Sequence, residues 1–302
     1  MRFVTAEKDG RVFVGSVNDD LTEVIDLQAA EKELMNQEQI PNTMIDCITL
    51  GEHFTKRVEH LYTVMNDDKT KNSYTYPLSK VKLLAPIPCP RKNIFCVGKN
   101  YAEHAIELGS EDDIPEHVML FSKSPTTVIG PDEVVLNHQN VTNQLDYEGE
   151  LAVIIGKKGK GISAGEAMDY VFGYTIINDI TARDLQARHK QFLLGKSLDT
   201  SCPMGPYVVH KAKIENPNSL RISTKVNGEV RQASNTEQFI FNIETIIAVI
   251  SQGMTLEPGD IIATGTPAGV GKGFTPPRFL QPGDVIEISV EGVGILRNTI
   301  EG

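Results

Sequence analysis

Acidic side chains alternate along the stretch LDYEGELAVII, residues 145–155, which otherwise has the apolar character of a β-strand. Because strand side chains point to alternate faces, Asp146, Glu148 and Glu150 should share one face. The other face should then hold the larger apolar side chains: Leu145, Tyr147, Leu151, Val153 and Ile155. Neighbouring like charges repel one another, so either water solvates this acidic row or a cation binds it.

A third acidic residue supports the binding of a cation. Glu148 and Glu150 offer two carboxylates, whereas a hard cation of this kind takes six or more oxygen ligands. Asp179, in the run YTIINDITARDLQ, stands at the end of an apolar strand where the chain turns into a helix. Three carboxylates without cysteine or histidine ligands favour Mg²⁺ or Mn²⁺ over zinc. The alternative is a solvent-facing strand at a sheet edge, where acidic side chains prevent pairing with other strands.

A candidate acid–base pair lies in IFCVGKNYAEHAIELG, residues 94–109. A strand is predicted to stop at Gly98, and a short helix then carries His104 and Glu107 three residues apart, on one face. A histidine held by a carboxylate is the usual general base for deprotonating water near neutral pH. The alternative is an ordinary ion pair on a surface helix. The acidic, irregular segment GSEDDIPEH follows, so the helix borders a loop that could move as a lid.

Four further side chains could hold an anionic substrate. Lys123 in LFSKSP and Lys196 in LGKSLD lie in mainly apolar or neutral runs, and either could supply positive charge to a carboxylate or an oxyanion. Arg183 and Gln186 follow Asp179 by four and seven residues, so they are predicted to lie on neighbouring turns of one helical face. The alternative for all four is an ordinary solvated side chain.

Two common functional motifs, a phosphate-binding loop and a serine-hydrolase elbow, are not present in complete form. The run GTPAGVGKG, residues 265–273, resembles a phosphate-binding loop. However, Gly273 stands where a Ser or Thr should bind magnesium, and the preceding glycine is wrongly spaced, so no nucleotide site is predicted. The sequence also lacks a G-x-S-x-G elbow, which leaves a serine hydrolase unsupported.

The composition is that of an ordinary globular protein: 302 residues, 40% hydrophobic and 23% charged. This length predicts one large domain or a domain with an appendage. Neither a membrane-spanning run nor a signal peptide is recognisable, so we expect a cytoplasmic protein without membrane insertion. The net charge of −11 argues against binding to nucleic acid. The four cysteines lack the spacing of a zinc site or a disulfide framework.

Short periodic runs and turn signals position these residues. Residues 1–80 predict a small α/β region, with strands at 1–7, 11–17 and 23–27, helices at 28–38 and 43–66, and a polar loop at 67–77. Asp9-Gly10 predicts a hairpin between the first two strands. Residues 81–302 are dominated by short strands, with a hairpin at Asn227-Gly228 and an amphipathic helix at 242–252 that Gly253 caps. The prediction is an α+β fold, mostly β, with helices packed outside.

Taken in order, the motifs resemble the fumarylacetoacetate hydrolase family, and within it the short branch of acylpyruvate hydrolases and oxaloacetate decarboxylases. The similarity runs from about residue 82 to the C-terminus. It rests on these runs: GKNYAEHAIE, LFSKSP, DYEGELAVIIG, NDITARDLQ, GKSLDT, VNGEVRQ and PGDIIATGTPAGVG. The resemblance implies a mixed β-sandwich roll for residues 81–302, with residues 1–80 as a small N-terminal appendage, and a homodimer.

The resemblance also implies a role for each candidate residue. Glu148, Glu150 and Asp179 match the family's ligands for a divalent metal, here Mg²⁺ or Mn²⁺. The catalytic positions it implies are His104 and Glu107, a dyad on a lid helix, and Lys123. The positions it implies for substrate binding are Arg183, Gln186, Lys196 and Thr266, the last in the run GTP.

The activity that this resemblance implies is metal-dependent cleavage of a C–C bond in a small 2-oxo acid through a metal-bound enolate. Oxaloacetate decarboxylation to pyruvate, acylpyruvate hydrolysis, or both, are the expected reactions. The alternative within the family is hydrolysis or isomerisation of a 2,4-dioxo acid derived from a sugar or an aromatic acid. A different class of function, a regulatory or binding protein on a retained enzyme scaffold, also stays open.

Overall fold

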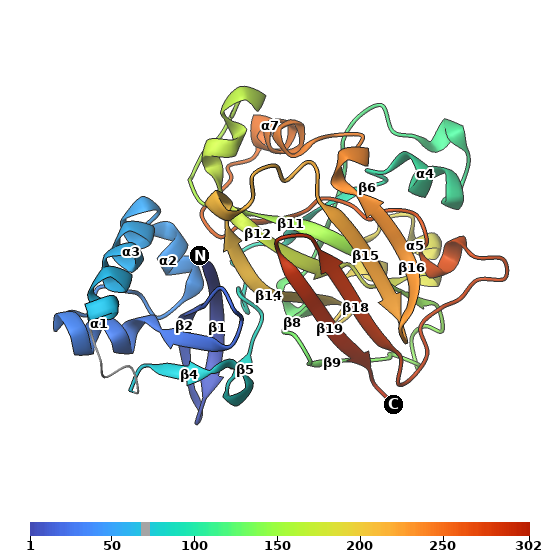
Figure 1. Ribbon diagram of the computed structural model, residues 1–302. Coiled ribbons are helices and arrows are strands. Elements are labelled where there is room, and N and C mark those ends of the chain that lie inside the picture. The colour runs from blue at the N-terminus through green and yellow to red at the C-terminus, as the bar shows by residue number, and fades with distance from the viewer. Residues whose placement is uncertain (68–72) are drawn as a thin grey trace.

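The computed structural model describes residues 1–67 and 73–302 (Figure 1). Its framework is a mixed sheet in which the strands follow the order β4, β3, β2, β1, β14, β12, β11, β17, β6 and β7, with β5 beside β1 and β8 beside β14. These strands are β1 (Arg2–Lys8), β2 (Arg11–Val17), β3 (Glu23–Asp26), β4 (Thr75–Pro77), β5 (Lys82–Leu83), β6 (Ile94–Gly98), β7 (Met119–Lys123), β8 (Val128–Ile129), β11 (Gly149–Ile155), β12 (Val171–Asn178), β14 (Cys202–His210) and β17 (Ile261–Ala263).

A smaller sheet packs over the large one, and a shared apolar core lies between them. Leu151 and Ile176 from the large sheet belong to the same buried cluster as Ile222 and Ile288 from the small one. The small sheet has the order β16 (Glu229–Asn235), β15 (Arg221–Val226), β18 (Val285–Val290), β19 (Gly294–Ile300) and β9 (Val134–Val135). A separate short pair is formed by β10 (Leu145–Asp146) and β13 (Thr181–Ala182). The predicted α+β fold, mostly β, is confirmed.

The helices lie around the outside of the sheets (Figure 1). They are α1 (Leu27–Met35), α2 (Met44–Thr49), α3 (Glu52–Asp67), α4 (Ala102–Leu108), α5 (Arg183–His189), α6 (Leu193–Lys196) and α7 (Ile243–Gly253). The first three cover the N-terminal strands, whereas α7 packs against the 3₁₀ segment η4 (Ala164–Tyr170), away from the N-terminal helices. Three short helices, α4, α5 and α6, lie close to the candidate site and carry five of its predicted side chains: His104, Glu107, Arg183, Gln186 and Lys196.

The predicted helix at 43–66 is wrong in one respect, because the chain forms two helices there. Thr43 caps α2 by accepting a hydrogen bond from the backbone N–H of Asp46. Gly51 then has a φ of +57°, a left-handed conformation that interrupts the helix before α3 begins at Glu52. The apolar spacing of this stretch is nearly continuous, so periodicity alone hides the break.

The two hairpin predictions are confirmed. Asp9 and Gly10 have φ angles of +51° and +78°, and Asn227 and Gly228 have φ angles of +52° and +80°. Two consecutive left-handed residues match the right-handed twist of the flanking strands.

Two other boundary predictions need correction. Gly253 belongs to the last turn of α7, and Met254 takes the capping position. The polar loop predicted at 67–77 contains strand β4, which pairs with β3, while residues 68–72 of that prediction lie outside the described residues.

The N-terminal strands extend the large sheet. Strand β1 pairs with β14, with Arg2 opposite Val209 and Phe3 opposite Val208. Phe3 packs on Phe172 of β12 with ring centroids 5.9 Å apart, so apolar contacts join the two parts. The division of the chain near residue 80 stays a prediction.

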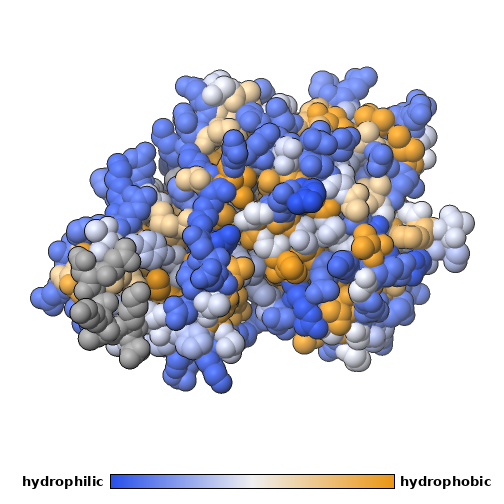
Figure 2. Space-filling view, in the orientation of Figure 1, coloured by the Kyte–Doolittle hydropathy of each residue, from blue (hydrophilic) through white to orange (hydrophobic). Residues whose placement is uncertain are grey.

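The surface differs between these parts. Figure 2 shows hydrophilic side chains over the N-terminal helices, and apolar surface interspersed over the small sheet. Exposed apolar residues of the small sheet include Val134, Val230 and Ile295, each more than half exposed. Within residues 1–67 and 73–302, no helix combines the length and the apolar character needed to cross a bilayer.

Candidate active site

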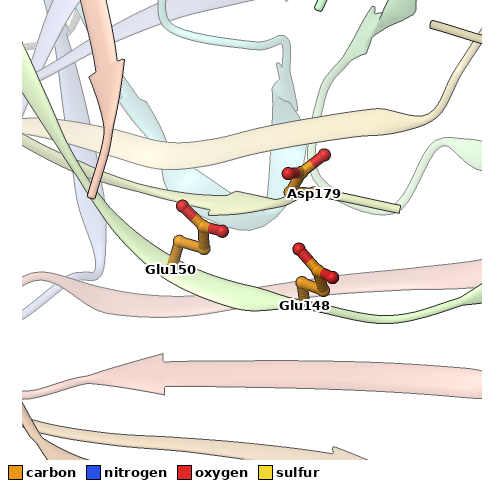
Figure 3. A group of neighbouring side chains, drawn as sticks. All are labelled: Glu148, Glu150 and Asp179. Carbon is orange, nitrogen blue, oxygen red and sulfur yellow. The ribbon is translucent and has the colours of Figure 1, made fainter. Parts of the chain in front are cut away.

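Three buried carboxylates converge from two neighbouring strands (Figure 3). Glu148 immediately precedes β11, Glu150 lies in it, and Asp179 follows the last residue of β12. Their side chains offer oxygens within 4.8 Å of one another, and the three residues are 4%, 1% and 0% exposed. Strand β11 lies between β12 and β17 and is buried along its whole length. The alternative of a solvent-facing edge strand is therefore wrong.

Asp146 does not belong to this group, which corrects the prediction of one acidic face. Strand β10 ends at Asp146 and β11 begins only at Gly149, so the regular alternation is interrupted between them. The Asp146 carboxylate instead accepts hydrogen bonds from Arg183 Nε at 2.8 Å and from the backbone N–H groups of Gly271 and Lys272 at 2.6 and 3.0 Å. Asp146 therefore fixes the loop at residues 265–273, the run that resembles a phosphate-binding motif without matching it.

Three cationic side chains lie directly on the carboxylates. Lys196 Nζ is 2.7 Å from Glu148 Oε2 and 2.8 Å from Asp179 Oδ2. Lys123 Nζ is 2.8 Å from Asp179 Oδ1 and donates to the carbonyl of Ile180 at 2.9 Å. Arg183 is likewise buried, with Nη2 2.7 Å from Glu148 Oε1. The alternative of solvated side chains is wrong for all three cations.

The charges in this site do not balance. Four buried carboxylates (Asp146, Glu148, Glu150 and Asp179) face three buried cations (Lys123, Arg183 and Lys196), which leaves one negative charge without a partner. Burying a charge without a partner is costly. The site therefore suits a divalent cation, which would change its net charge from −1 to +1 and prepare it for an anionic substrate.

The imbalance falls on Glu150. Burial alone would raise the pKa of Glu148, but the charges of Lys196 and Arg183 lower it to about 2. Burial, together with the neighbouring Asp179 and Glu148, instead holds the pKa of Glu150 well above its usual range. The Glu150 carboxylate accepts a hydrogen bond from Gly265 N at 2.8 Å. A cation bound between these oxygens would relieve the repulsion.

His104 and Glu107 form a pair on the inner side of helix α4. His104 Nδ1 lies 2.7 Å from Glu107 Oε1, and Glu107 Oε2 accepts a hydrogen bond from Gly269 N at 2.8 Å. His104 is only 4% exposed, so the alternative of a surface ion pair is wrong. A carboxylate can only accept, so Nδ1 carries the proton in the neutral ring, and Nε2 is left with a lone pair. That arrangement suits a general base.

Arg183 and Gln186 lie on one face of α5, but Asp179 does not share their helix. The helix begins at Arg183, and the short strand β13 separates it from Asp179. Arg183 Nη1 donates to Gln186 Oε1 at 3.2 Å. The prediction of a common helical face is therefore right for two of the three residues.

Thr266 joins the small sheet to the floor of the site. Its hydroxyl donates to the carbonyl of Gly149 at 3.0 Å and accepts from Gln232 Nε2 at 2.7 Å. Gln232 is fully buried and also accepts from Gly149 N at 3.1 Å. Gln232 was not predicted, although it ends the run VNGEVRQ, because a single glutamine in a strand carries no chemical signal of its own.

A glycine allows Lys196 to reach the carboxylates. A Cβ at Gly195 would lie 2.6 Å from Gln186 N and 2.9 Å from the carbonyl oxygen of Ala182. These backbone atoms, one in α5 and one in β13, cannot move aside as a flexible side chain can. Gly195 therefore permits the close approach of α6 to α5 that sets the position of Lys196.

A cavity of about 230 Å³ opens beside these residues. This is at the small end for ligand sites, which suits a small acid rather than a nucleotide. Its lining includes seven of the predicted residues: His104, Glu148, Glu150, Arg183, Gln186, Lys196 and Thr266. The other three predicted residues, Glu107, Lys123 and Asp179, lie behind it in contact with these. The functional role of each predicted residue stays a prediction.

Sequence reasoning missed two lysines and an apolar wall in this cavity. Lys99 follows the last residue of β6, and Lys272 lies in the run GTPAGVGKG. The apolar wall includes Met119, Phe121 and Phe192. The position of Lys99 after a strand was a usable signal, whereas Lys272 was tested only as part of a phosphate-binding loop.

Comparison with known proteins identifies the family. The model of the fumarylacetoacetate hydrolase C-terminal domain matches residues 93–301. The chain belongs to the fumarylacetoacetate hydrolase family. Enzymes of this family generally use a divalent metal, and the acidic triad of this chain could bind one. The predicted resemblance is confirmed.

Full-length relatives show the same family membership. The chain is 56% identical over 301 residues to oxaloacetate tautomerase YisK of Bacillus subtilis, with 99% of this chain and 100% of the relative covered. A solved fumarylacetoacetate hydrolase from Exiguobacterium antarcticum is 39% identical with a TM-score of 0.81, covering 100% of this chain and 99% of that one. A solved 2-hydroxyhepta-2,4-diene-1,7-dioate isomerase from Mycobacterium marinum is 31% identical with a TM-score of 0.73, covering 100% and 98%.

Proposed function

We propose that this protein acts on oxaloacetate, moving a proton at C3 to interconvert its keto and enol forms and releasing C4 as carbon dioxide to give pyruvate. The observation that carries the proposal is the placement of His104 in the same cavity as Glu148 and Glu150, with Nδ1 held by Glu107. Both reactions pass through an enolate at C2 and C3, so one site can serve both. The name of the Bacillus subtilis relative supports the choice of oxaloacetate.

Glu148, Glu150 and Asp179 would hold the metal, proposed as Mg²⁺ or Mn²⁺ because every donor is a carboxylate oxygen. When bound, such an ion supplies Lewis-acid stabilisation for negative charge that develops on the 2-oxo group, an effect of several kcal/mol. Lys196 keeps Glu148 and Asp179 in place through its two short contacts. Arg183 orients the other oxygen of Glu148.

His104 would move the proton. In tautomerisation its Nε2 takes a proton from C3 of the keto form, and the enolate oxygen is then protonated to give the enol. In decarboxylation the C3–C4 bond breaks, carbon dioxide leaves, and the electron pair of that bond forms the enolate of pyruvate. Nε2, after taking a proton from solvent, then donates it to C3. Glu107 stabilises the imidazolium in either direction, and Gly269 N fixes Glu107. Base catalysis of this kind contributes roughly 10²- to 10⁴-fold.

Hydrolysis of acylpyruvates is a second candidate. The apolar wall of Met119, Phe121 and Phe192 offers room for an acyl chain that oxaloacetate lacks. His104 Nε2 would then deprotonate a water that attacks C4, and the charge of Lys123 or Lys196 would stabilise the resulting oxyanion. The isomerase from Mycobacterium marinum supports a wider range of dicarboxylic substrates in this family.

The first experiment compares enol disappearance and pyruvate formation from oxaloacetate, using chelator-stripped protein with Mn²⁺ or Mg²⁺ added back. A metal-only blank is essential, since free metal also promotes decarboxylation. We expect activity well above that blank, abolished in Glu148→Ala and reduced about 10²- to 10⁴-fold in His104→Ala. His60→Ala, an exposed histidine on α3, is the matched control. Full activity after metal removal would reject the scheme.

A homodimer is proposed as well. The family resemblance supports it, and Ile295, an apolar residue of β19 that is 58% exposed, is a candidate for the interface. We expect light scattering to give twice the chain mass of 33.2 kDa. Ile295→Lys should lower that mass if the small sheet forms the interface, and an unchanged dimer would place the interface elsewhere.

A further inference from the structure

Lys272 is a cavity-lining cation that the mechanism above does not use. It lies on the 3₁₀ turn η7 (Gly271–Gly273), which the Asp146 carboxylate fixes through the two backbone N–H groups described above. The backbone of Lys272 is therefore held firmly, while its side chain lies exposed at the mouth of the cavity. A rigid backbone under a solvent-accessible ammonium group suits the recognition of an anion.

The charge environment of Lys272 differs from that of the other lysines in the cavity. Lys196 contacts two carboxylates, and Lys99 Nζ lies 2.9 Å from Asp113 Oδ1. Among the residues that the structure describes, no carboxylate comes within 4.0 Å of Lys272 Nζ. Arg183 and Lys99 are close enough to repel it, and the nearby Asp146, which attracts it, already accepts hydrogen bonds from Arg183 Nε and from two backbone N–H groups. In a chain with a net charge of −11, an unpaired lysine beside two other cations is an unmatched positive charge.

The arrangement of charges along the cavity indicates which part of a substrate Lys272 would meet. The acidic triad lies at the inner end, where the 2-oxo acid group would bind, and Lys272 lies at the mouth. A monocarboxylic 2-oxo acid would present only a methyl or alkyl group to the mouth. A dicarboxylic one would present a second carboxylate, which pairs with an ammonium group.

We propose that Lys272 is a specificity-determining residue that binds the distal carboxylate of a 2-oxo dicarboxylic acid, so that the site favours diacids over monoacids of equal length. This inference rests on the proposed function for the binding of the 2-oxo acid group at the triad. Lys99 contributes less to the same selection, because Asp113 already neutralises it.

The test is equilibrium binding to the Mn²⁺-loaded full-length protein by calorimetry. The probes are 2-oxoglutarate and 2-oxopentanoate, which share the 2-oxo acid group and five carbons but end in a carboxylate and a methyl group. Neither has a carboxylate or a carbonyl placed for C–C cleavage. We expect Lys272→Met to weaken the binding of 2-oxoglutarate about fivefold and to change that of 2-oxopentanoate by less than about twofold.

Two further variants sharpen the result. Lys272→Arg keeps the charge and should restore most of the preference for the diacid, whereas Lys99→Met should lower it less than Lys272→Met does. Lys225→Met, which removes an exposed lysine from β15, should leave both affinities at the wild-type values.

An equal loss of affinity for both probes in Lys272→Met would overturn the inference, because the lysine would then act on the shared group or on the fold. An unchanged ratio of the two affinities would overturn it as well. Oxaloacetate turnover by the wild-type protein is measured in parallel. Absent turnover with a Lys272-dependent diacid preference rejects the proposed reaction and supports the carboxylate site, whereas turnover with an unchanged ratio rejects the carboxylate site alone.

Discussion

Buried acids occur in two parts of this molecule, and their partners differ. In the N-terminal region, Glu31 of α1 is fully buried, forms an ion pair with Arg57, and accepts hydrogen bonds from the backbone N–H groups of Gln39 and Ile40 at 2.7 and 2.9 Å. In the cavity, Glu150 is almost as buried, yet Asp179 and Glu148 place two like charges beside it, and its hydrogen-bond partner is the N–H of Gly265.

This difference separates a structural acid from one suited to binding. Each oxygen of Glu31 has a partner within the protein, so nothing further is needed to stabilise its charge. The lysines near Glu150 already pair with its neighbours: Lys123 contacts Asp179, and Lys196 contacts both Glu148 and Asp179. Active sites commonly keep such unsatisfied charges at a cost in stability. Burial alone would not have distinguished the two glutamates.

Replacing Glu150 with Gln should give the largest effect. The amide keeps the shape and an acceptor for Gly265 N, but removes a ligand charge. We expect Mn²⁺ affinity to fall by more than the roughly 10- to 100-fold that loss of an outer-shell partner costs, with activity falling alongside. Calorimetric titration with Mn²⁺ measures the affinity.

The same variant should not destabilise the metal-free protein. A carboxyl group whose pKa is raised on folding loses stability as pH rises from its ordinary pKa toward the raised value, and Gln removes that loss at neutral pH. Urea unfolding of chelator-stripped protein at pH 7 should therefore give a free energy equal to or above that of the wild type. A clear loss of stability would mean that Glu150 is a structural acid like Glu31.

Glu31→Ala should have the opposite profile. It leaves Arg57 without its partner and two backbone N–H groups without an acceptor, which together cost about 3 kcal/mol in the free energy of unfolding. Urea unfolding measures the loss, and Mn²⁺ affinity of the folded protein should match the wild type. The control Glu38→Ala, which removes an exposed ion pair with Lys32, should leave the free energy of unfolding close to the wild-type value. Similar losses in both variants would contradict this account.

Gly195→Ala tests how closely the cations must approach the triad. The added methyl group meets two backbone atoms of the neighbouring segment, so α6 must move, at a cost of about 1–3 kcal/mol. Lys196 should move with it, which predicts a larger fall in activity than in stability. Gly253→Ala is a suitable control, because a Cβ there meets nothing within 4 Å. Wild-type activity in Gly195→Ala would show that the position of Lys196 is not critical.

The sequence was most informative where a local rule determines the structure. The consecutive Asp9-Gly10 and Asn227-Gly228 pairs specify hairpins without help from the rest of the chain. The carboxylates of Glu148 and Glu150 in an apolar strand likewise indicated a binding site, because burying such charges without a bound partner is costly. The order of short motifs then predicted the family, which the comparisons confirm.

Features that depend on tertiary contacts could not be read in this way. The break before α3 comes from the left-handed Gly51 within a continuous apolar pattern. Asp146 looked like a member of the acidic row, but contacts with Arg183 and a loop more than a hundred residues away give it another task. Folding likewise brings Lys272 near Arg183 and Lys99 without placing a carboxylate of the described residues within 4.0 Å of its ammonium group.

The smallest expected effect concerns His210, which lies where the N-terminal strands meet the rest of the large sheet. Its backbone N–H donates to the carbonyl of Met1 at 3.0 Å, and its ring packs edge-on against Phe172 with centroids 5.3 Å apart. Burial, with smaller effects from the N-terminal amine and Lys211, lowers the pKa of His210 to about 4. The folded protein therefore binds fewer protons than the unfolded chain between pH 6.5 and about 4, so stability should fall as pH falls through that window.

Because the His210 side chain is partly exposed, we expect its contribution over that window to be about 1 kcal/mol rather than the full value of the shift. Urea unfolding of wild type and His210→Gln from pH 7 to pH 4 isolates this effect, since the carboxylates titrate equally in both. The variant should show a shallower loss of stability with falling pH, and its activity at pH 7 should equal that of the wild type. Parallel pH profiles would mean that His210 is protonated as easily in the folded state as in the unfolded one. Suppose instead that activity changes while the dependence of stability on pH does not. His210 would then influence the cavity, and the distinction between structural charges such as Glu31 and functional charges such as Glu150 would be weaker.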